Sequence, residues 1–153
     1  MATWGEFSEA APGLAATGAR LLTQFGPGLG FLATVRPDGG PRLHPICPVI
    51  AERELWGFIL RESPKCADLR RDGRYALHSF PPEEVDDEFV VTGRAVPVDA
   101  VPGDDLWQRL SGATTASVGV HDEVLFRLEV ESAMSSTYEE RGVFPPAHAS
   151  WRA

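Results

Sequence analysis

Apolar residues recur in short runs along most of the chain, often alternating with polar ones. This alternation is typical of strands with one face buried. Pro37–Gly40 forms a strong turn signal between two of the runs, and the other links are also short, so neighbouring strands should pair antiparallel. The predicted strands are Gly30–Arg36, Pro41–Ile50, Leu55–Leu60, Arg74–Phe80, Glu88–Val98 and Glu123–Glu131, with Ala147–Arg152 as a candidate short terminal strand.

Three segments instead carry helical signals. Thr3–Phe25 opens with Thr3 and Glu6 at capping-box spacing, and Pro12-Gly13 should split this helix in two. A second helix should begin at Ser63-Pro64, a good N-cap followed by proline at the first helical position, and should end before Asp72-Gly73. A short third helix is predicted over Asp104–Leu110.

These elements predict a mainly β protein of the α+β type: a six-stranded antiparallel barrel with short peripheral helices. A length of 153 residues suits a single domain. We expect a helical segment over residues 1–28, the core barrel over 29–98, and a helix, the last strands and a tail over 99–153. Gly93 interrupts a strand pattern and predicts a β-bulge.

The charge balance narrows the range of partners. The chain carries 14 basic and 22 acidic residues, a formal net charge of −8, and its only lysine is Lys65. Nucleic acids and anionic membranes attract basic surfaces, so neither is an expected partner. Cys47 and Cys66 have no disulfide or metal spacing, and no apolar run has the length of a membrane span. We expect reduced thiols in a soluble, cytoplasmic protein.

The junction Leu60–Lys65 is the sharpest chemical feature. It leads a strand into a helix whose first backbone N–H groups are free and favour an anion. Lys65 lies in the first turn, where a cation opposes the helix dipole unless an anion sits between them. Two interpretations stay open: a phosphate site, or an ordinary capped helix with an exposed lysine. Arg42 can be a second phosphate ligand, or simply a surface charge beside a turn.

The order of these pieces resembles a known family. The runs FLATVRPDGGPRLHPICPVI, ELWGFILRESPKCADLRRDGRYALHSF and EFVVTGRAVPV are similar to the FMN-binding split β-barrel family related to pyridoxamine 5′-phosphate oxidase. The resemblance implies a split barrel, an FMN-binding homodimer with the cofactor between subunits, and a small-molecule oxidoreductase. The sequence lacks the full set of substrate-binding residues of the true pyridoxamine-phosphate oxidases, including their longer basic C-terminal region. Pyridoxamine phosphate is therefore not the expected substrate.

The resemblance also implies a set of cofactor contacts. The phosphate contacts would come from Arg42 and the run Ser63, Pro64 and Lys65, and contacts to the rest of the cofactor from Leu43, His44, Phe58, Ile59 and Trp151. Partner-chain contacts would come from Phe89–Thr92. No catalytic residue follows from the resemblance, since the cofactor carries the chemistry.

Two alternatives remain at this stage. Some relatives use the deazaflavin F420, whose acidic tail favours a more basic groove than a chain of charge −8 offers. The second alternative is that this chain is a flavin- or haem-binding dimeric module, or a dimeric relative with an emptied site, without turnover of its own. A metal site is not expected, because the four histidines lack ligand spacing and the acidic run Glu83–Glu88 lacks the pattern of a calcium loop.

Overall fold

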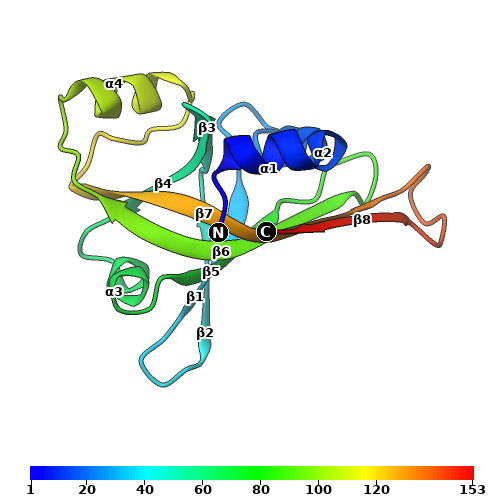
Figure 1. Cartoon of the computed structure of the whole chain (residues 1–153), viewed down its shortest axis with the longest axis horizontal. Coiled ribbons are helices and arrows are strands. Elements are labelled where there is room, and N and C mark those ends of the chain that lie inside the picture. The colour runs from blue at the N-terminus through cyan, green and yellow to red at the C-terminus, as the bar shows by residue number, and fades with distance from the viewer.

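A computed structural model describes all residues, 1–153, and contains one antiparallel sheet with four helices (Figure 1). The helices are α1 (Trp4–Ala10), α2 (Pro12–Leu22), α3 (Pro64–Arg71) and α4 (Asp105–Gly112). The strands are β1 (Gly30–Val35), β2 (Pro41–Ile46), β3 (Val49–Ala51), β4 (Glu54–Leu60), β5 (Arg74–Ser79), β6 (Glu88–Val98), β7 (Glu123–Thr137) and β8 (Ala147–Arg152). None of the helices combines the length and the apolar character needed to cross a membrane.

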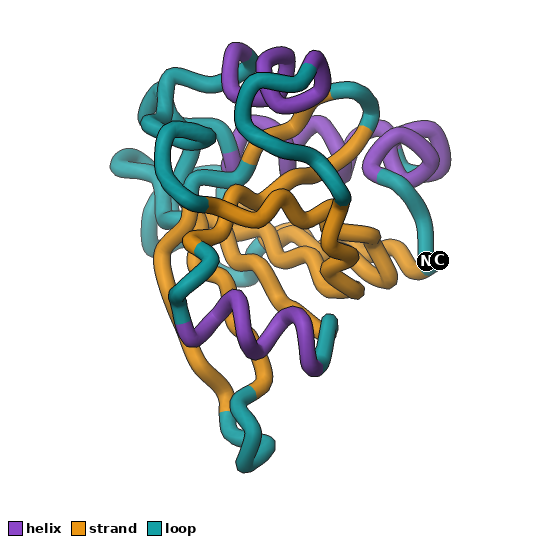
Figure 2. The backbone as a smooth tube through the Cα atoms, turned by 90° about the vertical axis from the view of Figure 1, so that its left-hand side faces the viewer, coloured by secondary structure: helices purple, strands orange, loops and turns teal.

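The strand order is β2-β1-β5-β6-β7-β4-β3, and β8 pairs with the C-terminal half of β7. The sheet curls strongly, so the β1–β2 hairpin projects away from β8, and the two chain ends lie close together (Figures 1 and 2). Strand β7 spans 15 residues and pairs with β6 along most of its length. It is therefore the strand that joins the two halves of the sheet.

The structure has eight strands where the alternation predicted six and a candidate seventh. The run Pro41–Ile50 divides into β2 and β3, because the chain turns at Cys47-Pro48 to pair with β1 first and β4 next. Strand β7 also continues beyond the predicted Glu131 to Thr137, since β8 supplies a partner for this extension. Both differences arise from pairing between distant segments.

Local signals set the helix starts as predicted. Thr3 and Glu6 form the capping box of α1, with the Glu6 N–H donating to Thr3 Oγ1 at 3.0 Å and the Thr3 N–H to Glu6 Oε2 at 2.7 Å. Pro12 begins α2 after a break at Ala11. Ser63 caps α3, and its Oγ accepts the Cys66 N–H at 3.3 Å.

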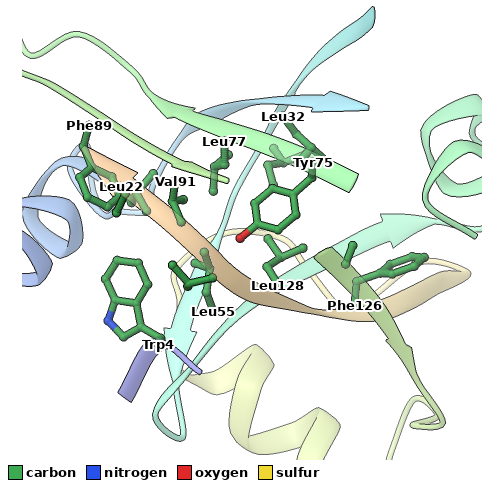
Figure 3. Close-up of a cluster of buried hydrophobic side chains, with 14 of the residues drawn as sticks. Trp4, Leu22, Leu32, Leu55, Tyr75, Leu77, Phe89, Val91, Phe126 and Leu128 are labelled. Atoms are coloured by element: carbon green, nitrogen blue, oxygen red, sulfur yellow. The ribbon is translucent and has the colours of Figure 1, made fainter. Parts of the chain in front are cut away.

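The main core lies between α1, α2 and the inner face of the sheet. Apolar side chains from both layers converge there (Figure 3), and the aromatic rings of Phe7 and Phe89 are fully buried. A smaller cluster under α4 covers the other face of β4 and β7, where Trp107 packs edge-on against Phe58 at 4.9 Å. Beyond α4, no helix covers the outer face of β1, β5 and β6.

Gly93 marks a register shift between β6 and β7, which confirms the predicted bulge. A Cβ at this position would lie 1.8 Å from the Glu129 carbonyl oxygen. The same carbonyl accepts a hydrogen bond from the buried hydroxyl of Tyr75 at 3.2 Å. Glycine therefore lets two backbones approach closely at the centre of the sheet.

We expect Gly93→Ala to lower the free energy of unfolding by at least about 2 kcal/mol, because the new methyl group must displace the β7 backbone. Gly112→Ala is the matched control, since nothing lies within 4 Å of a Cβ there. It should leave stability unchanged or raise it by up to about 1 kcal/mol. Urea unfolding of both variants measures the difference, and equal effects would contradict the close approach at Gly93.

Candidate functional site

The β1–β2 pairing sets the direction of two predicted site residues. Arg42 lies opposite Thr34, and His44 lies opposite Leu32. Both β1 partners are buried on the inner face of the sheet. Side chains that are directly opposite share a face in an antiparallel pair. Arg42 and His44 therefore point inward, toward α3.

Asp68 of α3 joins this helix to the two strands. Its carboxylate is almost fully buried, with 1% of the residue exposed. It accepts hydrogen bonds from Arg42 Nε at 2.6 Å, Thr34 Oγ1 at 2.9 Å and Arg71 Nη1 at 3.3 Å. Burial alone would raise the pKa of Asp68, but the bonds from Arg42 and Thr34 outweigh it and lower this pKa. Asp68 is thus an ionised anchor that fixes Arg42.

Asp68 and Thr34 are the site residues that the sequence did not reveal. The only signal was the helical period, which puts Asp68 one turn after Lys65. Nothing in the sequence indicates that Arg42 of a strand and Asp68 of a helix will contact each other. The pairing of β1 with β2 and the packing of α3 against β1 bring them together.

The α3 N-terminus contains three of the predicted phosphate contacts. Ser63 is occupied by the cap, because its hydroxyl also donates to the Leu60 carbonyl at 2.6 Å. Pro64 has no N–H to offer. Lys65 is half-buried and has no ion pair or hydrogen bond within the chain. Burial lowers the pKa of its ammonium group. The Cys66 N–H is also committed, since it binds Ser63, and the Ala67 N–H binds the Ser63 carbonyl. The uncommitted groups here are the side chain and the backbone N–H of Lys65.

His44 lies within electrostatic reach of these cations. Burial lowers its pKa most, and the positive charges of Lys65 and Arg42 lower it further, while Asp68 acts in the opposite direction. The imidazole is therefore neutral at neutral pH. Its Nε2 atom is buried and has no hydrogen-bond partner. A buried polar atom without a partner is costly and is often a sign of a ligand site.

The remaining predicted contacts lie elsewhere in one chain. Leu43 is 63% exposed and points to the outer face, opposite Arg42 and His44. Phe58 and Ile59 are buried in the two cores, so only their backbone is accessible. Strand β3 pairs with β4 only over Glu54–Trp56. The same edge of β4 therefore has no strand partner from Gly57 onward.

Two further predictions concern the far side of the sheet. Trp151 packs against Phe7 of α1 at 5.1 Å. Strand β8, which carries it, lies on the opposite side of the molecule from α3 (Figure 1). In Phe89–Thr92, Phe89 and Val91 are buried in the main core, and the other two side chains face outward. One chain therefore brings together Arg42, His44 and Lys65, but not these residues.

No cavity of the single chain encloses the three. A pocket of about 360 Å³ begins beside them, lined by Leu60, Glu62, Ser63 and Asp122. No group of three or more His, Cys, Asp or Glu side chains has a geometry that could hold a metal ion. The arrangement is an open, basic surface with an unpaired lysine, and it can bind an anionic group.

Comparison with known proteins places this geometry in context. A family model described as pyridoxamine 5′-phosphate oxidase matches residues 20–135. Comparison with curated proteins found no match. A haem-binding protein from Mycobacterium smegmatis is similar in structure, with a TM-score of 0.63 and 17% identity. The match covers 90% of this chain but only 57% of that protein.

Two other solved structures match most of their own length. PhzG from Burkholderia lata 383, solved with tetrahydrophenazine-1-carboxylic acid, has a TM-score of 0.60 and 15% identity, and the match covers 97% of this chain and 92% of PhzG. An F420 reductase has a TM-score of 0.53 and 21% identity, with 74% and 92% covered. At such identities the likeness concerns the fold, and it confirms the predicted split β-barrel.

We expect Asp68→Asn to lower the free energy of unfolding at neutral pH by about 1.5–3 kcal/mol, because its hydrogen bonds to Arg42 and Arg71 lose their charge. The folded-state pKa of Asp68 is depressed, so wild type has this stabilisation above the ordinary value of 3.8 and loses it as the pH falls through the folded-state value. The gap between wild type and variant should therefore narrow in acid. Urea unfolding across the pH range measures it.

Asp122→Asn is the control for this prediction. Asp122 pairs with Arg61 at 2.8 Å, but both side chains are exposed. Its loss should cost less than about 1 kcal/mol. Equal costs for the two variants would show that Asp68 is not a structural anchor.

Proposed function

We propose that this chain, which belongs to the pyridoxamine 5′-phosphate oxidase family, binds FMN non-covalently and acts as an oxidoreductase on a small molecule. The observation that carries the proposal is Lys65, an unpaired and half-buried lysine at the N-terminus of α3. Lys65 and Arg42 both lie close enough to His44 for their charges to lower its pKa, and His44 Nε2 has no hydrogen-bond partner. A phosphate monoester supplies the negative charge and the acceptor oxygens that these groups lack.

The charges around Lys65 support one phosphate group. Arg42 uses Nε to bind Asp68, which leaves its two terminal nitrogens without a partner in the chain. The Arg42 guanidinium is thereby fixed in position, and its two terminal nitrogens can donate to a phosphate oxygen. The ammonium group and the backbone N–H of Lys65 can bind the other oxygens. Ser63 is left with a capping role.

The rest of the cofactor would lie along β2 and the free edge of β4. Backbone groups of Gly57–Leu60 that face away from β7 have no strand partner and can bind the polar edge of a ring system. His44 Nε2 is the nearest side-chain group that needs a partner. When bound, FMN supplies hydride or electron transfer. The protein's part is to hold and orient it.

A homodimer with the cofactor between subunits completes this proposal. The outer face of the sheet beyond α4 is uncovered and carries exposed or half-exposed apolar side chains. Leu43 and Met134 are the most exposed of these, at 63% and 41%. A second copy on this face would bury them. Two free cysteines, one of them buried, suit a reducing, cytoplasmic location.

Two other ligands remain to be compared with FMN, because similar structures include an F420 reductase and a haem-binding protein. The acidic tail of F420 favours a basic groove beyond the phosphate. Near α3, however, Arg61 is paired with Asp122, and Arg71 with Asp68. Arg70 of the same helix is unpaired but lines a different pocket, so Lys65 is the uncompensated cation beside Arg42, which favours the shorter FMN. Turnover itself distinguishes an enzyme from a binding module.

We expect Lys65→Ala to weaken FMN binding about tenfold to a hundredfold, because one charge-assisted contact to the phosphate is lost. Riboflavin, which lacks the phosphate, should change less than about twofold. Fluorescence titration with both ligands measures the difference. Arg70→Ala is the control, since Arg70 is an exposed, unpaired cation of the same helix that lines a different pocket, beside Arg61 and Val101.

Several results would contradict the proposal. A protein that binds neither ligand is not a flavoprotein. Equal weakening of FMN and riboflavin would place the phosphate elsewhere. An absorption spectrum with a single deazaflavin band or a haem Soret band on the purified protein would select F420 or haem instead.

We expect Met134→Glu to raise the protomer concentration for half-dissociation of the dimer at least about tenfold, because it places a charge in the apolar interface. Val120→Glu is the control, since Val120 is 68% exposed in the α4–β7 connection. Analytical ultracentrifugation measures both. A monomeric wild-type protein, or a dimer unaffected by Met134→Glu, would contradict the proposed interface.

A further inference from the structure

His44 is a half-buried, titratable group to which the proposed function assigns no change of protonation. The charged groups that face it come from two elements. Its own strand, β2, contributes Arg42, and α3 contributes Lys65 and Asp68, with Arg71 bound to Asp68. Strand β1 packs on the other side of β2 and presents uncharged Leu32 and Thr34. Nothing in the chain satisfies His44 Nε2.

We propose that an anion binding at Lys65 is accompanied by uptake of one proton at His44, so that the site binds the anion and the proton together. This inference rests on the proposed phosphate site. It concerns the regulation of that site by pH, which neither the family nor the fold determines.

The charge balance explains the coupling. Lys65, Arg42 and Arg71 contribute three positive charges, and Asp68 removes one. Without an anion, a proton on His44 would raise the local charge further, which is unfavourable in a half-buried site. A phosphate with a charge near −2 reverses this balance. The imidazolium then becomes favourable, and the N–H on its buried Nε2 atom can donate to a phosphate oxygen.

The proton balance is simple. Solvent supplies one proton to the imidazole, no covalent bond changes, and the anion enters as the dianion. Free His44 has a pKa below its ordinary value, and the bound anion raises it. Affinity therefore increases as the pH falls through the interval between the free and the bound values. A rise of one pKa unit corresponds to about tenfold tighter binding by the protonated form.

Sulfate is the decisive probe, because it keeps its double charge across this pH range, whereas the phosphate of FMN titrates near pH 6. The His44 ring can be followed by NMR in ¹³C,¹⁵N-histidine-labelled wild-type protein, with His44→Gln used to assign its signals. We expect saturating sulfate to raise the titration midpoint of His44 by at least about one unit relative to sodium chloride at equal ionic strength.

Calorimetry of FMN binding gives a second measurement. Titrations in buffers of different ionisation enthalpy report the protons taken up, and wild type should take up more than His44→Gln, by up to one proton. Release from the FMN phosphate is common to both proteins and cancels in the difference.

The outcomes separate the two proposals. If FMN binds, but sulfate does not shift His44 or wild type takes up no more protons than His44→Gln, the proton coupling is overturned and the proposed FMN site is retained. Failure to bind FMN together with a sulfate-induced shift of His44 would overturn the proposed cofactor but support the coupled anion site. An unshifted His44 under saturating sulfate overturns the coupling in every case.

Discussion

The arrangement of the candidate site depends on one buried carboxylate. Asp68 is almost wholly excluded from solvent yet ionised, so the fold must surround it with donors. Those donors come from β1, β2 and α3, three segments that are separated in the chain. Satisfying Asp68 therefore fixes the position of α3 against the β1–β2 hairpin. That position sets where the N-terminus of α3 opens and where Lys65 stands relative to Arg42. A structural requirement of the interior thus determines the geometry of a surface site.

Lys65 differs from most of the other basic residues because it has no ion pair. Most of the thirteen arginines, on a chain of net charge −8, are paired with carboxylates, and the exposed pairs contribute little to stability. Lys65 has no partner, is half-buried and lies at the end of a helix where a cation is unfavourable. Arg70 and Arg94 are also without an ion pair, but neither lies beside Arg42 at a helix N-terminus, so Lys65 is the free cation placed to attract an anion there. The overall acidity then repels polyanions without weakening that local site.

The sequence predicted what local chemistry determines. Thr3 with Glu6, Ser63 with Pro64, and Gly93 each mark a cap or a bulge through residues a few positions apart, and the structure confirms all three. The resemblance placed Arg42 and Lys65, which the fold brings near each other. It could not show that Ser63 is occupied by its own helix, because a capping serine and a phosphate-binding serine look alike in sequence. Nor could it reveal Asp68, the break between β2 and β3, or the burial of Phe58, because these depend on contacts between distant segments.

His44 links the stability of the fold to its ligand. A buried donor or acceptor without a partner costs about 1–3 kcal/mol. His44 carries this cost on β2, which is an edge strand of the sheet. The neighbouring cations add to it, since they prevent the imidazole from gaining a charge and a stronger bond. In the proposed coupling, a bound anion would remove both penalties at once: it would supply an acceptor and neutralise the cations. The free energy that the empty fold leaves unsatisfied at His44 then becomes part of the binding free energy, and affinity at this site is set as much by what the chain lacks as by the contacts it offers.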